Sequence, residues 1–237
     1  MEIKILGKYG PFSSVGSTSS YLVKGENSYA LLDCGSGAVK KLLNENCLDK
    51  LSFVFLSHLH FDHISDIGVL SYALAPVLKG KKIKLYTFVD DSLIMKVIQS
   101  LNCFEVVCVE ENKIFQNGEF AFEFFKMTHP VTSYGIKIKN NNQTFAYSGD
   151  TTKNENIYNL IKGASLAFLD GAFLQKDYAD GKPHMSIKQV CEIAKESGVK
   201  TVVTHFSPTN ADIDVENECK EFGGNVLIAK EDVVYSV

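Results

Sequence analysis

The histidines of this chain are concentrated where they could do chemistry together. Three of the six lie within six residues, in the segment His58–His63. The other three, His129, His184 and His205, follow singly, with Asp150 among them. Imidazole nitrogens and carboxylate oxygens are common ligands of divalent metal ions. The residue types therefore predict a scaffold for a metal site.

The spacing within the histidine segment indicates two ions. His58 and His60 are two residues apart, so on an extended segment they point the same way and can share one ion. Asp62 and His63 are adjacent in a turn before a helix and can reach a second ion. Two ions about 3.5–4 Å apart can hold a hydroxide between them and clamp the attacked and leaving oxygens of a hydrolysis. The remaining donors would be a bridging carboxylate and one more histidine for each ion: Asp150, His129 and His205.

The element that must position the histidine segment is the apolar run that precedes it. Residues 51–56 are almost continuously apolar, which is typical of a strand buried on both faces. The histidines follow at the carboxyl end of this strand, where binding sites form in α/β sheets. A His-x-His pair alone is a weak signal, because alternating histidines also occur on strand surfaces. The whole His-x-His-x-Asp-His pattern after a buried strand is specific.

The rest of the chain reads as strands first and then as alternating strands and helices. This order predicts the α/β class, as a four-layer αβ/βα sandwich with helices outside paired sheets. No linker, repeat or low-complexity stretch interrupts it, so one domain over 1–237 is expected. Strands are expected at 1–6, 20–24, 29–33, 51–56, 119–127, 133–138, 144–148, 166–170, 201–204 and 225–228. Helices are expected at 39–46, 64–77, 92–101, 154–162, 186–197 and 210–222.

Composition limits where the protein works. The chain has 237 residues, 45% of them hydrophobic, enough for a substantial core. It shows no basic-then-apolar leader and no run of 18 apolar residues, so neither export nor a membrane span is expected. The six cysteines form no Cys-x-x-Cys pair, which favours reduced thiols. A cytoplasmic location follows.

Charge argues against long nucleic acids as partners. All 24 basic residues are lysines, and the formal net charge is -4. A protein that grips a long nucleic acid usually has a basic surface, often with arginine on phosphates. The lysine runs at 79–84 and 137–139 are interpreted as solvated strand ends or loops rather than as phosphate-binding patches.

These motifs resemble those of the metallo-β-lactamase superfamily, and within it the short phosphodiesterases similar to ribonuclease Z. The resemblance covers nearly the whole chain. An additional element, His184-Met185-Ser186, resembles one found in the phosphodiesterase branch. The five superfamily motifs are matched by Leu31–Gly35, His58–His63, Thr128–Pro130, Ser148–Thr151 and Thr204–Pro208.

The resemblance assigns a role to each matched residue. Asp62 could also accept a proton from the attacking water. His184 would stabilise the phosphoryl oxyanion or assist the leaving group, and Asp170 would orient His184. Asp33 would brace the site without binding metal. The implied ligands are His58, His60 and His129 for one ion, Asp62, His63 and His205 for the other, and Asp150 as the bridge.

Departures from the superfamily narrow the expected function. The three-histidine β-lactamases have a cysteine where Asp150 stands, and the thioesterase and lactonase branches usually follow the histidines with Gly-Gly, whereas this chain has Ile64-Ser65-Asp66. Ribonuclease Z proper carries a long tRNA-binding arm, generally between the third and fourth motifs. Here His129 and Asp150 leave no room for one. Phe61 stands where a small residue is common, and could either narrow the pocket or simply pack.

The sequence therefore predicts a dinuclear phosphodiesterase of small or cyclic phosphodiesters, of the nucleotide or sugar phosphate kind, acting through a metal-bridging hydroxide. The two divalent ions are expected to be zinc, with manganese and iron also suited to the ligands. Alternatives are an arm-less tRNA 3′ processing endonuclease, a thioester or lactone hydrolase, and a non-catalytic, metal-stabilised nucleotide-binding protein. Relatives in this branch are often homodimers, although the sequence itself leaves the oligomeric state open.

Overall fold

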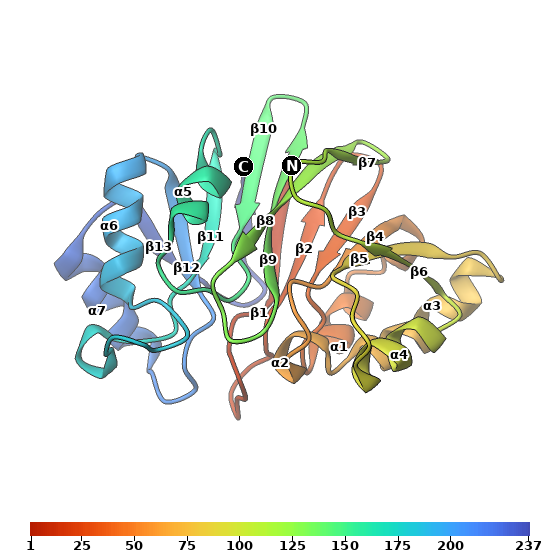
Figure 1. Ribbon diagram of the computed structural model, residues 1–237, viewed down its shortest axis with the longest axis horizontal. Helices are drawn as coiled ribbons and strands as arrows, with labels where there is room; N and C mark the ends of the chain where they lie inside the picture. Colours follow the sequence, from red (N-terminus) through yellow and green to blue (C-terminus); the bar gives the residue numbers. More distant parts are fainter.

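Two mixed β-sheets pack face to face at the centre of the molecule (Figure 1). The computed structural model describes residues 1–237. The first sheet has seven strands, in the order β14 (Val234–Ser236), β1 (Glu2–Gly7), β2 (Ser20–Lys24), β3 (Tyr29–Leu32), β4 (Leu51–Phe55), β5 (Ile83–Thr87) and β6 (Phe104–Cys108). The second also has seven, in the order β13 (Val226–Ile228), β12 (Lys200–Thr204), β11 (Leu166–Asp170), β10 (Gln143–Tyr147), β9 (Ser133–Asn140), β8 (Phe120–Met127) and β7 (Phe115–Asn117).

Helices cover the outer face of each sheet, and the predicted four-layer αβ/βα sandwich is confirmed (Figure 1). None of the helices combines the length and apolarity that a membrane crossing requires. Beside the first sheet lie α1 (Ala38–Asn44), α2 (Phe61–Ile64), α3 (Ile67–Leu78) and α4 (Leu93–Ser100). Beside the second lie α5 (Glu155–Ile161), α6 (Ile187–Ser197) and α7 (Asp212–Phe222), and two short 3₁₀ helices span Leu48–Lys50 and Gln175–Asp177.

Strand β4 shows how the apolar pattern builds the layers. Its side chains alternate between the faces of the sheet, so Phe53 and Phe55 enter the core between the sheets while Val54 faces the helices. Phe53 stacks on Phe122 and Phe55 stacks on Phe124 of the second sheet, with ring centroids 4.7 and 5.2 Å apart. The predicted strand buried on both faces is therefore confirmed, and it is fixed between two apolar layers directly before the histidine segment.

The structure contains four strands that the sequence did not indicate: β5, β6, β7 and β14. Strand β5 begins at the end of the lysine run, where Lys84 alternates with the buried Ile83 and Leu85. Strands β7 and β14 have three residues each and exist only through pairing with β8 and β1. Such short segments carry too little periodicity to stand out, because their hydrogen-bond partners are distant in the chain.

Strand direction gathers the functional loops at one end of the sandwich. In the first sheet β3 and β4 are parallel. In the second, β8 and β10 both run antiparallel to β9, and β10, β11 and β12 are mutually parallel. The carboxyl ends of β8, β10, β11 and β12 therefore meet at one edge of their sheet. Each of these ends leads into a residue singled out by the sequence: His129, Asp150, Asp170 and His205.

Candidate metal centre

The structure brings all seven predicted ligands together. His58 and His60 lie in the loop after β4, while Asp62 and His63 belong to the short helix α2 rather than to the expected turn before a helix. The others follow separate strand ends of the second sheet. Neighbouring donor atoms form three groups that share Asp150, and the atoms of each group lie within 4.8 Å of one another. Two of these groups consist of predicted ligands, and the third joins Asp150 and His205 to the pair Asp170 and His184.

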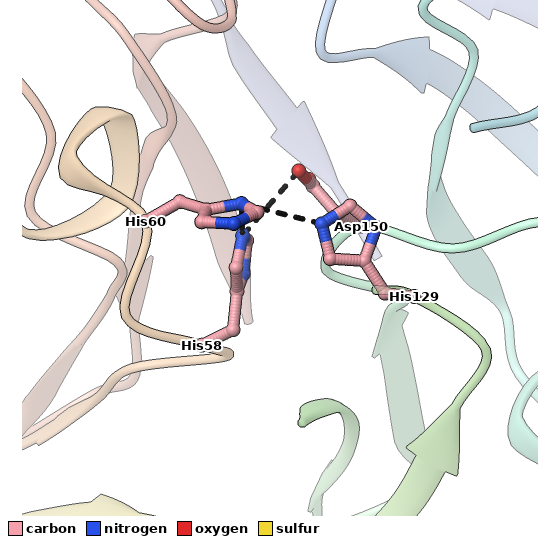
Figure 2. A group of neighbouring side chains, drawn as sticks. All are labelled: His58, His60, His129 and Asp150. Carbon is pink, nitrogen blue, oxygen red and sulfur yellow. Dashed lines mark hydrogen bonds and ion pairs between the residues drawn. The ribbon is translucent and has the colours of Figure 1, made fainter. Parts of the chain in front are cut away.

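The first cluster, as we call it, consists of His58, His60 and His129. The Nδ1 atom of His60 lies 3.0 Å from Nε2 of His58 and 3.2 Å from Nε2 of His129. Figure 2 shows the three rings converging with the carboxylate of Asp150 on a common point. His58 is fully buried, whereas His60 and His129 are half-buried. This cluster thus opens to the surface on one side.

The second cluster consists of Asp62, His63 and His205. The Nε2 atom of His205 lies 3.3 Å from Nε2 of His63 and 3.2 Å from Oδ2 of Asp62. All three residues are buried. His205 has a left-handed backbone conformation with φ of 61°, which turns its ring back from the end of β12 toward α2.

Asp150 lies between the two clusters. Its Oδ2 atom is 3.5 Å from Nε2 of His58 and 3.3 Å from Nε2 of His205, and its Oδ1 atom is 3.2 Å from Nε2 of His63. Gly149 makes this placement possible, because its φ is 59° and a Cβ there would lie 2.7 Å from the Cβ of Ser57. The carboxylate can therefore face both clusters at once.

The donor set fits two divalent cations. Ligands around a tetrahedral zinc at about 2.0–2.1 Å lie roughly 3.3 Å from each other, and the donors within each cluster are 3.0–3.5 Å apart. Asp150 Oδ1 is buried without a hydrogen-bond partner, an arrangement that a cation would satisfy. The residues present thus suit the predicted metal pair, and their role as ligands stays a prediction.

The electrostatics of the two clusters differ. Burial lowers the pKa of all three histidines in the first cluster, so His58, His60 and His129 offer neutral nitrogens. In the second cluster burial acts in the same direction, but Asp150 and other carboxylates outweigh it. They hold the pKa of His63 well above its usual range and raise that of His205 to about 10.

Asp33 supports the site from behind, as the sequence predicted. Its Oδ2 atom is 2.8 Å from Nδ1 of His63 and accepts hydrogen bonds from the hydroxyls of Ser57 and Tyr147, at 2.8 and 2.6 Å. Its Oδ1 atom accepts from the Ser57 backbone N–H, and Ser57 Oγ lies 3.0 Å from Nδ1 of His58. Sequence reasoning missed Ser57 and Tyr147, although each directly precedes one of the motifs, at His58 and at Ser148.

His184 and Asp170 form a further pair at the edge of the clusters. Nδ1 of His184 lies 2.8 Å from Oδ2 of Asp170, the contact that the sequence predicted. The His184 ring stacks on that of His205 at 4.9 Å, and its Nδ1 atom is 3.8 Å from Oδ2 of Asp150. Burial opposes protonation of His184, but the Asp170 carboxylate raises its pKa. The backbone N–H of Thr151 fixes Asp170 in turn, at 2.9 Å.

Two hollows flank the clusters. One, of about 180 Å³, is lined by Asp62 of the second cluster together with Phe12 and Phe61. The other, of about 440 Å³, is lined by His129 of the first cluster together with Lys182. The sequence left open whether Phe61 narrows the pocket or simply packs. Its side chain is 70% exposed, which excludes packing in the core. Phe61 instead lines the smaller hollow beside Asp62.

Comparisons with known proteins agree with this geometry. One protein-family model, described as anti-Pycsar protein Apyc1, matches residues 1–226. The probable metallo-hydrolase YhfI of Bacillus subtilis is 29% identical over 242 residues, covering 99% of both chains. Its crystal structure, titled as a metallo-beta-lactamase fold protein, superposes with a TM-score of 0.90 over 99% of this chain and 98% of that one.

More distant relatives share the fold. Ribonuclease Z of Sulfolobus acidocaldarius is 23% identical over 256 residues, covering 86% of this chain and 87% of its own. A diphosphatase from the PhnP family has a TM-score of 0.77 at 17% identity, over 100% of this chain and 97% of its own. The predicted resemblance to the ribonuclease Z-like branch of the metallo-β-lactamase superfamily is confirmed, and with it the class of metal-dependent hydrolase.

Proposed function

The chain belongs to the family of the anti-Pycsar protein Apyc1, and from this premise we propose that it is a dinuclear phosphodiesterase of small or cyclic phosphodiesters. Its substrates would be nucleotides or sugar phosphates with one internal diester. The free thiols of all six cysteines suit the cytoplasm as its place of action.

The two clusters would hold the metal ions. His58, His60 and His129 would bind one ion, the second cluster the other, and Asp150 both. Zinc suits the imidazole-rich donors, and manganese or iron would also fit them. Bound divalent cations supply positive charge to phosphoryl oxygens and lower the pKa of nearby water. Asp62 would accept a proton from that water.

The observation that carries the proposal is the His184–Asp170 pair. With Nδ1 of His184 donating to Asp170 at 2.8 Å, Nε2 is left to face a substrate. When water attacks phosphorus and one P–O ester bond breaks, an N–H at this position can bind the phosphoryl oxygen or donate a proton to the leaving oxygen. Hydrolysis by the metal ions alone would not require a histidine that a carboxylate holds in position.

Small substrates are favoured over long ones by the segment between His129 and Asp150. Strands β9 and β10 occupy almost all of it, and they are joined by the turn residues Asn141 and Asn142. No insertion is present there to grip a tRNA. The net charge of -4 and the absence of arginine point the same way.

The proposal is tested with the full chain loaded with zinc or manganese. Substrates would include bis(p-nitrophenyl) phosphate, 3′,5′-cyclic nucleotides, a cyclic sugar phosphate, a thioester and a lactone. We expect phosphodiester hydrolysis that is lost in Asp150→Ala and His58→Ala. Activity that survives both changes, or activity confined to the thioester or lactone, would refute the proposal.

A second candidate, tRNA 3′ processing, is supported by the match to ribonuclease Z along 86% of the chain. The assay is cleavage of a precursor tRNA beside a cyclic nucleotide under identical metal loading. Efficient cleavage of the tRNA with no turnover of the small diesters would favour this candidate over the first.

A further inference from the structure

We propose that the hollow beside Asp62 binds an aromatic base, and that Phe12 and Phe61 are the residues on which this base stacks. The inference rests on the proposed phosphodiesterase function and names the residues that would contact the base of a nucleotide substrate. It assigns a binding role to two side chains that the metal chemistry does not use.

The first support is the exposure of both rings. Phe12 is 67% exposed and Phe61 is 70% exposed, although both border the same hollow of about 180 Å³. Holding two phenylalanine rings in water forgoes the free energy of burying them. Large apolar side chains exposed around one concave site, in contact with catalytic groups, mark a surface that a ligand covers.

The backbone holds both residues close to the second cluster. Phe61 is the first residue of α2 and directly precedes Asp62. Phe12 lies in the loop that leaves β1, and this loop projects from the same end of the molecule as α2 (Figure 1). The loop passes so close to the site that a Cβ on Gly10 would lie 2.0 Å from Nε2 of His205.

Hydrogen bonds fix both ends of this loop. At its start, the Gly10 N–H donates to the Phe206 carbonyl at 3.2 Å. Near its end, Ser13 Oγ accepts from the Gly16 N–H at 3.1 Å, and Glu231 accepts from the Ser17 N–H at 2.6 Å. Phe12 is therefore presented from an anchored loop, which lowers the entropy lost when a ligand stacks on it.

The charge around this hollow suits a base rather than a phosphate. Its polar lining consists of hydroxyls from Ser13, Thr18, Ser36 and Ser65, with the Asp62 carboxylate as the one charged group. Hydroxyls can donate to and accept from the edges of a base, and no lysine lines this hollow to pair with a second phosphate. The opposite hollow contains Lys182 and lacks a pair of exposed phenylalanines. A base would thus lie over Phe12 and Phe61, with its phosphodiester at the clusters.

The test compares substrates that differ only in the base. Metal-loaded full-length protein would be assayed with a 3′,5′-cyclic nucleotide and with the methyl riboside 3′,5′-cyclic phosphate, which has no base. We expect Phe12→Ala and Phe61→Ala each to lower the preference for the nucleotide, measured as the ratio of kcat/KM values, by about tenfold, mainly through KM. Phe61→Trp should restore the preference, while Phe61→Leu should not.

A matched control is Tyr72→Ala on α3, a ring that is 82% exposed and borders neither hollow. It should leave the preference unchanged. Equal losses on both substrates, or no loss, would overturn the inference.

A binding assay separates this inference from the proposed function. Titration calorimetry with AMP and with ribose 5-phosphate measures the contribution of the base without turnover. If the wild-type protein hydrolyses neither diester, the proposed function fails. A tenfold weaker binding of AMP by Phe61→Ala would then still support the base site, and equal binding by wild type and variant would reject it.

Discussion

The first and second clusters offer different metal-binding donors in different surroundings. The first offers three neutral imidazoles, two of them half-buried, at the edge of a hollow. The second is buried throughout, contains a carboxylate of its own, and is supported by Asp33 from outside. An ion at the second cluster would therefore meet donors already fixed by the protein, while an ion at the first would meet donors that solvent and substrate can reach.

The two clusters would therefore have different roles. The buried second cluster, with its extra negative charge and its support from Asp33, would hold its ion firmly, whereas the open first cluster would allow its ion to exchange ligands during catalysis. Asp150 belongs to both, so it is the residue whose loss should affect them equally.

The largest effect is expected for Asp150→Ala. Without the shared carboxylate, no anionic group would lie between the two positive ions. Both ions should therefore be bound more weakly or be lost. We expect phosphodiesterase activity to fall by about 10³-fold or more. Metal content by elemental analysis and kcat/KM measure the two consequences. Asp91→Ala, at an exposed site away from the clusters, is the control. Full retention of two ions would contradict the shared role.

Chelator titration should separate the two clusters directly. We expect one ion to leave at a chelator concentration about tenfold or more below that needed for the other. His129→Ala should abolish the first, weaker step, and His205→Ala the second. Removal of both ions in a single step in the wild-type protein would mean that the clusters do not differ in the way proposed.

Asp33→Asn tests whether support from behind strengthens the second cluster. Asparagine tolerates the left-handed backbone at this position, where φ is 56°, so the fold should be preserved. The amide weakens the contact with Nδ1 of His63, which should reduce affinity for the second ion by about 10–100-fold. Competition with a zinc-binding dye gives that affinity. Equal weakening of both ions would show that Asp33 supports the whole site, since Ser57 links it to His58.

Asp170→Asn should act on His184 and leave both ions in place. Loss of the carboxylate removes the partner that orients the ring at 2.8 Å. We expect kcat to fall by about tenfold or more with little change in KM or metal content. If His184→Ala lowers kcat by the same factor, and the variant with both substitutions has no lower kcat, the two residues act together. Loss of metal would assign Asp170 to the second cluster instead.

The smallest effect is expected for a carboxylate far from both clusters. Glu119 accepts hydrogen bonds from three backbone N–H groups of the β2–β3 turn and from Asn140, as Asp33 accepts several at the site. Burial opposes ionisation, but these donors lower its pKa from 4.5 to about 2. Glu119→Gln should lower the free energy of unfolding by about 1 kcal/mol and leave metal binding unchanged.

The pH dependence of this effect has a defined sign. A lowered pKa in the folded state means that the ionised Glu119 stabilises the fold above pH 4.5, and that this contribution disappears as pH falls toward 2. The difference between wild type and Glu119→Gln should therefore be constant at neutral pH and vanish near pH 2. Denaturant unfolding at several pH values measures it, and a difference that grows in acid would contradict the assignment.

The sequence by itself determined which residues are the candidate ligands and most of the scaffold that positions them. Residues 51–63 combine a buried strand and four candidate ligands in one continuous segment, so their chemistry could be interpreted locally. The strands that lead into His129, Asp150, Asp170 and His205 were also predicted close to their observed bounds. Their apolar periodicity is strong because each faces the core.

Only the tertiary structure decided what is buried, braced or exposed. Tyr147 reaches Asp33 across 114 residues, and Phe12 shares a hollow with Phe61 from another loop. The edge strands β7 and β14, and the difference between the two clusters, likewise depend on which surfaces the sheets bring together. Packing sets these relations through contacts between distant segments, and local residue preferences do not encode which distant segment will be the partner.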